Sequence, residues 1–431
     1  MIDLYTLSVI IFFAVLGILI YKDRKSIDFK YVLIMRRTKR FRNLLDKIAR
    51  TSPLFWKITG TIAIIVCLGS MIFGIYNLLN NAYLVYIGVI VPPPALAIPI
   101  PAGQTIIVPG FIGIPFWFWI IVVATILIPH ETFHGIIART EKIKLKDVGL
   151  MLLLLQFISI PVVIIYFIYT KSFDLILFLT AALFSLVGAF VEPEEKQLKK
   201  SKLITKLRVF SAGSFINIII GISLALFVQT FIWSPNVHGI LITSVNETSP
   251  ASQIGLEPGM VIESIDNKQL SMNFYDYSFL TLLTSRSNSE DITKYISAII
   301  LSQTLSDYKP GDNVKLRVDG INYDFKLGER EIEVNETYFE KVPYIGITSE
   351  ANTKDINLFF VVFPLLSMMS LLNILVGIFN ILPLYPLDGG LVVKAITERY
   401  AKKISDKITL GLTFFMIFIL IYLVIGPFIK I

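Results

Sequence analysis

The sequence predicts a polytopic α-helical membrane protein of about eight transmembrane helices with an inserted α+β domain. Hydrophobic residues make up 55% of the 431-residue chain. Runs of about 20 apolar residues recur along it, and each is long enough to cross the hydrocarbon layer of a bilayer. Between residues 236 and 350 these runs give way to polar residues, Asp/Asn/Gly turns and short β-branched stretches. This change of composition indicates a separate folded domain of roughly 100 residues.

The apolar runs place the expected membrane spans. They are 4–20, 56–78, 115–138, 148–169, 173–191, 209–233, 357–380 and 408–428. No basic residue precedes the first span and no small-residue cleavage site follows it, so we expect a retained helix rather than a signal peptide.

The basic residues fall in alternate connections. Lys and Arg concentrate in residues 21–53, 139–147, 196–208 and 394–407, which share one side of the eight-span arrangement. Positive residues mark the cytoplasmic side of a membrane protein. We therefore expect a multi-pass protein of the cell membrane with the inserted domain outside. The net charge of +7 follows from this orientation, and no nucleic-acid partner is expected.

The segment 82–113 is apolar but cannot form one continuous helix, because prolines interrupt it at 92–94, 99, 101 and 109. Short pieces such as 105–108 alternate like strands. Non-helical backbone at membrane depth needs protein or a wet cavity beside it. The sequence leaves open whether this segment is a re-entrant hairpin against the neighbouring spans or an outer loop on the membrane surface.

A metal-binding motif closes the third span. His130 and His134 are four residues apart, which places both imidazoles on one face of a helix. This spacing holds one Zn²⁺ and leaves Glu131 beside the first ligand as a general base. The alternative is that the two histidines are ordinary buried residues of a helical core and bind no metal. The chain has only three histidines, however, and an ionisable residue inside a span is by default functional.

A catalytic zinc keeps three protein ligands, and Asp388 is the best candidate for the third. It lies in the run 380–390, whose prolines and glycines interrupt the helix and let a carboxylate turn inward. Without the other candidate ligands, Asp388 would be interpreted as a helix-end residue in a turn at the membrane interface. His238 lies in the polar insertion, and Cys67, the single cysteine, has no motif around it and permits no intrachain disulfide.

Depth in the membrane supports the pairing of Asp388 with the histidines. His130 precedes Arg139 by nine residues, about 13 Å along a helix axis. Asp388 precedes Lys394 by six residues on the same predicted side. Both parts of the site are therefore expected inside the membrane toward the cytoplasm.

Together these segments resemble the site-2 proteases, which are intramembrane zinc metalloproteases, and within them the archaeal-type members that carry a PDZ domain. The match runs from about 115 to 400. Its pieces are the zinc helix from His130 through Arg139, the segment 188–195, the Ala212-Gly213-x-x-x-Asn217 helix, and the Asn-x-x-Pro…Leu-Asp-Gly motif from Asn380 to Gly390.

The resemblance implies roles for individual residues. His130, His134 and Asp388 would hold one zinc per chain, with Glu131 activating water and Asn380 donating to the oxyanion. Asn217 would have a structural or substrate-facing role, and we assign it to substrate binding. Pro129 and Ser214 depart from the family pattern, and neither is expected to touch a ligand.

The inserted domain resembles a permuted, bacterial-type PDZ domain. The similarity rests on residues 246–267, 309–312 and 344–347. Such a domain captures a peptide end by strand addition. Residues 268–308 exceed what the fold needs and are a candidate helical insertion or flap.

The sequence thus predicts four regions. Residues 1–113 carry the first helices, the basic loop and the apolar β segment, and 114–235 carry the first part of the zinc core. The PDZ-like domain spans 236–350, and 351–431 complete the core.

The predicted function is an endopeptidase that cleaves transmembrane segments of membrane proteins in regulated intramembrane proteolysis. Its expected partners are transmembrane substrates, the lipid bilayer, and peptide ends at the PDZ-like domain. One alternative is a non-proteolytic PDZ-containing binding protein with a structural zinc, although such a site needs no Glu131. Another is a metal transporter, which usually shows an internal repeat of its spans; the sequence has no second copy of either motif.

Overall fold

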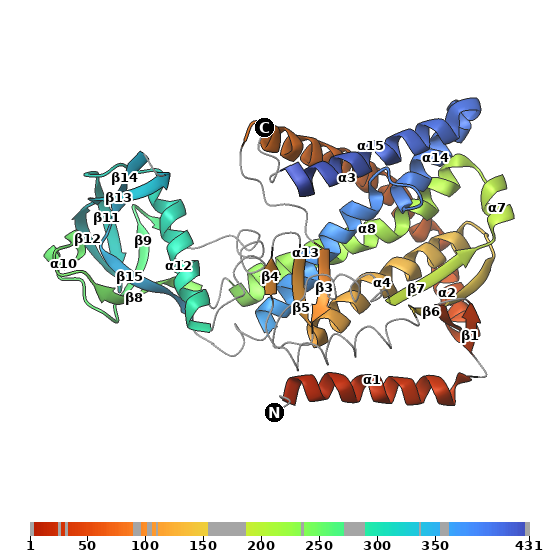
Figure 1. The fold of residues 1–431 in the computed structure, drawn as a ribbon, viewed down its shortest axis with the longest axis horizontal. Helices are drawn as coiled ribbons and strands as arrows, with labels where there is room; N and C mark the ends of the chain where they lie inside the picture. Colours follow the sequence, from red (N-terminus) through yellow and green to blue (C-terminus); the bar gives the residue numbers. More distant parts are fainter. Residues whose placement is uncertain are drawn as a thin grey trace. The chain divides into compact units, whose positions relative to one another are not determined.

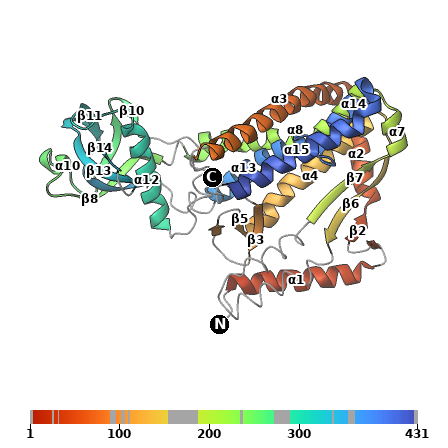
Figure 2. The same cartoon turned by 45° about the horizontal axis from the view of Figure 1, so that its top comes forward.

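We describe the fold from a computed structural model (Figure 1, Figure 2). It describes residues 4–24, 27–30, 33–88, 96–100, 106–108, 111–153, 187–233, 237–270, 289–335, 338–353 and 362–426. The chain divides into two compact units. One comprises Met1–Ile222 with Met369–Ile431, and the other comprises Ser223–Met368.

The first unit is mainly helical. Its helices are α1 (Leu4–Lys22), α2 (Lys39–Thr51), α3 (Pro53–Tyr86), α4 (Phe116–Thr140), α7 (Glu195–Lys200), α14 (Asp388–Tyr400), the 3₁₀ turn η4 (Lys402–Ile404) and α15 (Ser405–Ile425). Most of α8 (Leu203–Phe227) and of α13 (Phe363–Ile381) also belongs to it. Helix α15 lies beside α3 in both views (Figure 1, Figure 2).

Among the described residues, five helices are long and apolar enough to cross a membrane. They are Leu4–Lys22, Pro53–Tyr86, Phe116–Thr140, Leu203–Ile232 and Lys402–Ile425. The fourth joins α8 to the π-helical turn η2 (Val228–Trp233). Each coincides with one expected span. The expected span at 357–380 corresponds to α13, whose apolar part Leu365–Ile381 is shorter.

Two expected spans are wrong where the structure describes them. Residues 148–153 belong to strand β6 (Leu145–Leu153), and residues 187–191 belong to β7 (Val187–Pro193). These strands pair antiparallel with each other, which satisfies their backbone groups without a helix. A short continuous apolar run does not reveal by its period whether it is a buried strand or a helix. The remainder of the two expected spans, 154–169 and 173–186, lies outside the described residues.

Strands β6 and β7 belong to a four-stranded sheet. Its order is β1-β2-β6-β7, with β1 (Ile27–Lys30) and β2 (Leu33–Arg37) contributed by the basic connection. All neighbouring strands are antiparallel. Strand β7 forms one edge of the sheet and packs against α4. This contact brings a strand edge to the helix that carries His130 and His134.

A second small sheet precedes α4. It contains β3 (Leu96–Ile100), β4 (Ile106–Val108) and β5 (Phe111–Pro115), with β5 in the middle. Strand β5 pairs parallel with β3 and antiparallel with β4, and it leads directly into α4. The segment 82–113 thus contains strands, as its alternation predicts, although α3 extends to Tyr86. Its position relative to the membrane stays a prediction.

The second unit is built on a six-stranded sheet. The order is β12-β11-β9-β8-β15, and β10 pairs with β9. The strands are β8 (Val237–Val245), β9 (Val261–Ile265), β10 (Lys268–Gln269), β11 (Asn313–Val318), β12 (Ile321–Lys326) and β15 (Ile347–Thr353). Residues of β11 alternate between buried and exposed, as expected for a strand with one face on a core.

The rest of this unit packs around that sheet. Helix α12 (Ser289–Leu305) packs against β15, and its Ile296 and Ile300 join the core. The helix occupies part of the unassigned stretch 268–308, of which 271–288 lie outside the described residues. The unit also contains the short helix α10 (Pro250–Gln253) and the hairpin β13 (Gly328–Asn335) with β14 (Tyr338–Tyr344). The end of α8, η2 and the start of α13 belong to it as well.

Glycines bring the helices of the first unit close together. A Cβ added to Gly377 of α13 would lie 2.9 Å from the carbonyl oxygen of Ser214 in α8. A Cβ on Gly221 of α8 would lie 2.7 Å from that of Ser370 in α13. Helix interfaces in membranes use small residues in this way. The register between α8 and α13 is therefore tightly defined, and both helices lead into the candidate site.

Candidate metal centre

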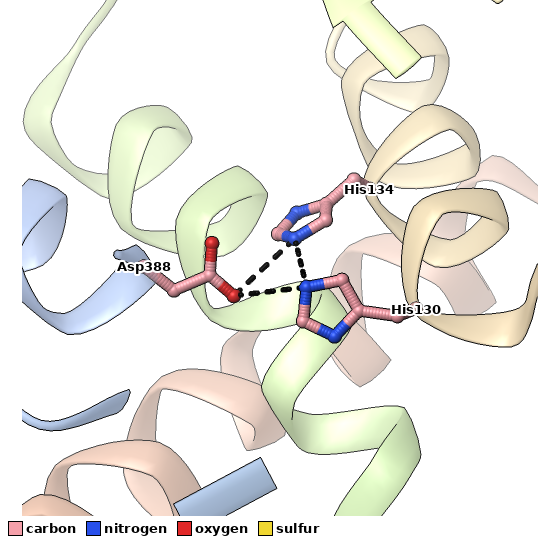
Figure 3. Close-up of side chains that lie close together, drawn as sticks. All are labelled: His130, His134 and Asp388. Carbon is pink, nitrogen blue, oxygen red and sulfur yellow. Dashed lines mark hydrogen bonds and ion pairs between the residues drawn. The ribbon is translucent and has the colours of Figure 1, made fainter. Parts of the chain in front are cut away.

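Three side chains from distant parts of the sequence meet inside the first unit. Nε2 of His130 lies 3.2 Å from Nε2 of His134. Oδ2 of Asp388 lies 3.4 Å from the first nitrogen and 3.3 Å from the second. Figure 3 shows this one carboxylate oxygen facing both imidazoles. His130 is buried, and the other two side chains are largely buried.

The separations fit a tetrahedral zinc site. Ligands bound to Zn²⁺ at about 2.0–2.1 Å in a tetrahedron stand about 3.3–3.4 Å from one another. The three observed separations are 3.2, 3.3 and 3.4 Å. Two imidazoles and one carboxylate form a donor set typical of catalytic zinc, which leaves a fourth position for water or substrate.

Helix α4 presents both histidines from one face. Their spacing of four residues stacks them about one turn apart. The helix stays continuous through Pro129, even though this proline donates no hydrogen bond to the carbonyl of Thr125. Next to His134, Gly135 leaves room for Leu45 of α2, whose Cδ1 would lie 2.6 Å from an added Cβ. The amphipathic helix α2 thereby packs against the ligand-bearing turn.

Asp388 reaches the site because the chain turns sharply between α13 and α14. Helix α13 ends at Ile381 and α14 begins at Asp388, with a cis Tyr385–Pro386 peptide bond between them. A Cβ at Gly389 would overlap the carbonyl oxygen of Ile381. The close return of α14 therefore requires a glycine directly after the ligand, and the Asp-Gly-Gly pattern reflects this requirement.

Contacts with α15 hold the other end of α14. Lys394 pairs with Asp406 at 3.1 Å, and the hydroxyls of Thr397 and Ser405 lie 2.8 Å apart. The hydrogen bond to Asp406 raises the pKa of Lys394 above its usual value. Both contacts hold α14 in the orientation that carries Asp388 into the site.

Ser214 contradicts the expectation that it touches no ligand. Its buried hydroxyl donates to Oδ2 of Asp388 at 3.0 Å. The contact depends on how α8 lies against the start of α14, and local sequence carries no information about that register. Pro129 fits the expectation better, because it only precedes His130 in the chain.

Helix α8 forms the wall behind the two imidazoles. Val209, Gly213 and Asn217 recur at every fourth position, so they lie along one face. A Cβ on Gly213 would overlap Nε2 of His134 and would lie 2.5 Å from Nε2 of His130. The position therefore admits only glycine. Nδ1 of His134 donates to the carbonyl oxygen of Val209 at 2.6 Å, which leaves the Nε2 lone pair directed at the ligand cluster.

Asn217 lies on the opposite side of His130 from Asp388. It is fully buried, and its Nδ2 is 3.2 Å from Nδ1 of His130. The structure thus brings Asn217 to a zinc-ligand candidate. Its assignment to substrate binding stays a prediction.

The side chain of Glu131, on α4, reaches the edge strand β7 of the four-stranded sheet. Its Oε2 accepts a hydrogen bond of 2.9 Å from the backbone N–H of Val191 in β7. The carboxylate is partly buried. The sequence motif predicted Glu131 as a general base. It could not predict the contact with Val191, because Val191 lies in a segment that was expected to be helical.

The remaining candidates are not members of the three-residue group His130, His134 and Asp388. Asn380 is partly exposed on the last turn of α13 and makes no side-chain hydrogen bond within the described residues. Cys67 is buried on α3 and donates to the carbonyl of Ser211 at 3.3 Å. His238 is the second residue of β8 and is outside the group His130, His134 and Asp388 that could hold a metal ion.

The family model described as Peptidase family M50 matches residues 118–423, more than half of the chain. The chain belongs to this family. M50 peptidases are the site-2 proteases, so the chain is a member of a family of zinc-dependent intramembrane metallopeptidases. No curated protein matches the sequence.

Membership in family M50 agrees with the donor set. The matched range contains His130, His134 and Asp388, the three residues whose ligand atoms all lie within 4.8 Å of one another. The five long apolar helices agree with a multi-pass membrane protein. The His-His-Asp cluster is therefore compatible with the zinc on which peptidases of this family depend.

Proposed function

We propose that the chain is an intramembrane zinc endopeptidase that cleaves transmembrane segments of other membrane proteins. The observation that carries this proposal is the spacing of the three ligand atoms, 3.2 to 3.4 Å. They come from α4, a long apolar helix, and from the first residue of α14. Membership in family M50 supports the same activity.

The residues of the site have distinct tasks in peptide hydrolysis. His130, His134 and Asp388 would hold the zinc, which would supply polarisation of the scissile carbonyl and acidification of water. Glu131 accepts a proton from the attacking water while the water oxygen forms a bond to the carbonyl carbon. It then delivers that proton to the amide nitrogen as the C–N bond breaks, which yields one carboxylic acid and one amine. The N–H of Val191 holds the Glu131 carboxylate in place.

Asn380 is the proposed donor to the oxyanion. An amide N–H stabilises the negative charge that develops on the carbonyl oxygen during attack. Asn380 suits this role because its side chain is partly exposed and, within the described residues, makes no hydrogen bond that substrate would have to break. Asn217 does not suit it equally well, because it is fully buried.

A helical substrate must unwind before cleavage, because helix carbonyls are already hydrogen-bonded and shielded. The sheet of β3, β4 and β5 leads into α4. We propose this apolar β segment as a place where an unwound substrate strand could pair.

The proposed PDZ-like domain, residues 236–350, lies within the second unit. Its sheet offers β15 as an edge strand beside α12, a strand-and-helix arrangement suited to the capture of a peptide end. The basic connections support an extracytoplasmic place for this unit and an active site toward the cytoplasm. In this proposal the domain selects substrates that have already been trimmed outside, and nucleic acid is no partner.

The test is co-expression of a single-span candidate substrate with the wild-type chain or with Glu131→Gln. The variant removes the base but keeps side-chain size and all three ligands. We expect cleavage only by the wild type, with equal zinc content in both proteins. Cleavage by Glu131→Gln would remove Glu131 from its role. Zinc binding without cleavage of any membrane-spanning substrate by the wild type would favour a structural metal.

A further inference from the structure

The further inference concerns Asn217 and rests on the proposed zinc site. Asn217 is 0% exposed. The only hydrogen bond of its side chain within the described residues joins Nδ2 to Nδ1 of His130 at 3.2 Å. Its Oδ1 is buried and has no partner within the described residues. A buried amide with an unused oxygen next to a metal-ligand candidate calls for a functional explanation.

The protonation pattern of His130 decides which amide atom can face it. A neutral imidazole carries its hydrogen on one ring nitrogen and a lone pair on the other. If Nδ2 of Asn217 donates to Nδ1, the hydrogen of His130 lies on Nε2, the atom that faces Asp388 and His134. Zinc needs the lone pair of that same Nε2. The orientation with Nδ2 toward the ring therefore opposes metal binding.

A half-turn of the carboxamide removes this conflict. It exchanges Oδ1 and Nδ2 at nearly the same positions. Oδ1 then accepts the Nδ1–H of His130, and Nε2 keeps its lone pair. No other hydrogen bond of this side chain within the described residues is broken by the turn.

The second histidine already shows the required arrangement. Its Nδ1 donates to the carbonyl oxygen of Val209, an atom that can only accept. Val209 and Asn217 lie four residues before and after Gly213, whose missing side chain leaves room for both imidazoles. One face of α8 thus supplies an acceptor for each histidine and space between them.

We infer that Asn217 is a positioning residue of the metal centre, whose Oδ1 accepts from Nδ1 of His130 and so directs the Nε2 lone pair at zinc. This gives the Gly213-x-x-x-Asn217 spacing a physical meaning. The glycine admits the two rings, and the asparagine one turn later orients the first. Hydrogen bonds of this kind to a ligating histidine are typically worth about 10–100-fold in metal affinity.

Asn217→Asp and Asn217→Leu separate the two amide orientations. Aspartate has nearly the same shape as asparagine and keeps an acceptor, but when ionised it has no donor. Leucine keeps comparable bulk and has neither. The matched control is Asn373→Leu. Asn373 is also a buried asparagine whose Oδ1 has no partner among the described residues, but its Nδ2 donates to Thr125 and to the Met369 carbonyl instead of contacting a ligand.

The experiment measures zinc affinity of the detergent-purified full chain by competition with a chelator, and the visible absorption of the Co²⁺-substituted protein. We expect the zinc affinity of Asn217→Asp to stay within about threefold of that of the wild type. Asn217→Leu should bind zinc about 10–100-fold more weakly. Asn373→Leu should match the wild type. The Co²⁺ spectrum should change for Asn217→Leu alone.

Two results would overturn the inference. Equal losses in Asn217→Asp and Asn217→Leu would mean that the amide N–H, or the exact shape of asparagine, is what matters. Wild-type affinity in Asn217→Leu would mean that the contact has no role. Melting of the zinc-free proteins identifies any variant that fails to fold, and Asn217→Asp against wild type then still decides the question. If the wild-type chain binds zinc but cleaves no substrate, the proposed function is wrong, but this inference about Asn217 still stands.

Discussion

The hydroxyl of Ser214 donates to Oδ2 of Asp388, the same oxygen that faces both histidines. Ser214 is on α8 and Asp388 begins α14. Helix α8 therefore contacts every member of the candidate cluster: Asp388 through Ser214, His134 through Val209, and His130 through Asn217. The metal centre is built by three helices, although only two of them supply its ligands.

Ser214→Ala tests this contact. The substitution removes one hydrogen bond to a carboxylate and leaves the three ligands in place. We expect zinc affinity to fall about tenfold, at the lower end of the range for such supporting contacts. Competition with a chelator measures it. An affinity equal to that of the wild type would show that Asp388 is held without Ser214.

Gly213→Ala should have a larger effect. The added methyl group would overlap the Nε2 atoms that approach zinc, and the rings are held from behind by Val209 and Asn217. We expect zinc affinity to fall by more than about 100-fold, because the rings must leave their positions.

Gly411→Ala is the matched control for Gly213→Ala. It is also a glycine-to-alanine change within a membrane helix, but none of the described residues lies within 4 Å of its added Cβ. Its zinc affinity should be unchanged, with helix stability altered by no more than about 1 kcal/mol. Normal zinc binding by Gly213→Ala would contradict the close packing of α8 behind the imidazoles.

The histidine pair and Asp388 could be predicted from the sequence because each depends on local features. Spacing by four residues defines one helix face, and the prolines and glycines around Asp388 indicate a break in the helix. The supporting contacts could not be predicted. Val209 acts through its backbone carbonyl, which any residue could provide, and Ser214 acts through a helix register that no short motif encodes.

The error at β6 and β7 has a different origin. Their apolar residues continue into longer apolar runs, so the hydropathy that predicts spans also covers them. Their pairing joins Gly149 with Phe190 and Met151 with Gly188. That register is a property of two distant segments together, and neither segment shows it alone.

Val191→Pro tests the role of strand β7. Proline removes the N–H that donates to Glu131. At an edge strand with this N–H facing away from its partner, proline is tolerated. A hydrogen bond to a charged group contributes about 1.5–3 kcal/mol, so we expect cleavage to fall about 10–100-fold while zinc content stays unchanged.

Ala189→Pro is the control for Val191→Pro. Ala189 lies two residues earlier on the same edge of β7, so its N–H faces the same side. It does not donate to Glu131 in the described structure. We expect near-normal cleavage. Equal losses in the two variants would show that the strand, rather than the hydrogen bond to Glu131, is required.

The most direct test of the metal centre is the zinc content of the detergent-purified chain, wild type beside Asp388→Asn. Asparagine keeps the size of the side chain but loses the charge that helps to hold Zn²⁺. We predict one zinc per wild-type chain and a marked loss in the variant, which would place Asp388 with His130 and His134 at one ion. Equal zinc in both proteins would contradict Asp388 as the third ligand, and no zinc in the wild type would contradict the metal centre itself.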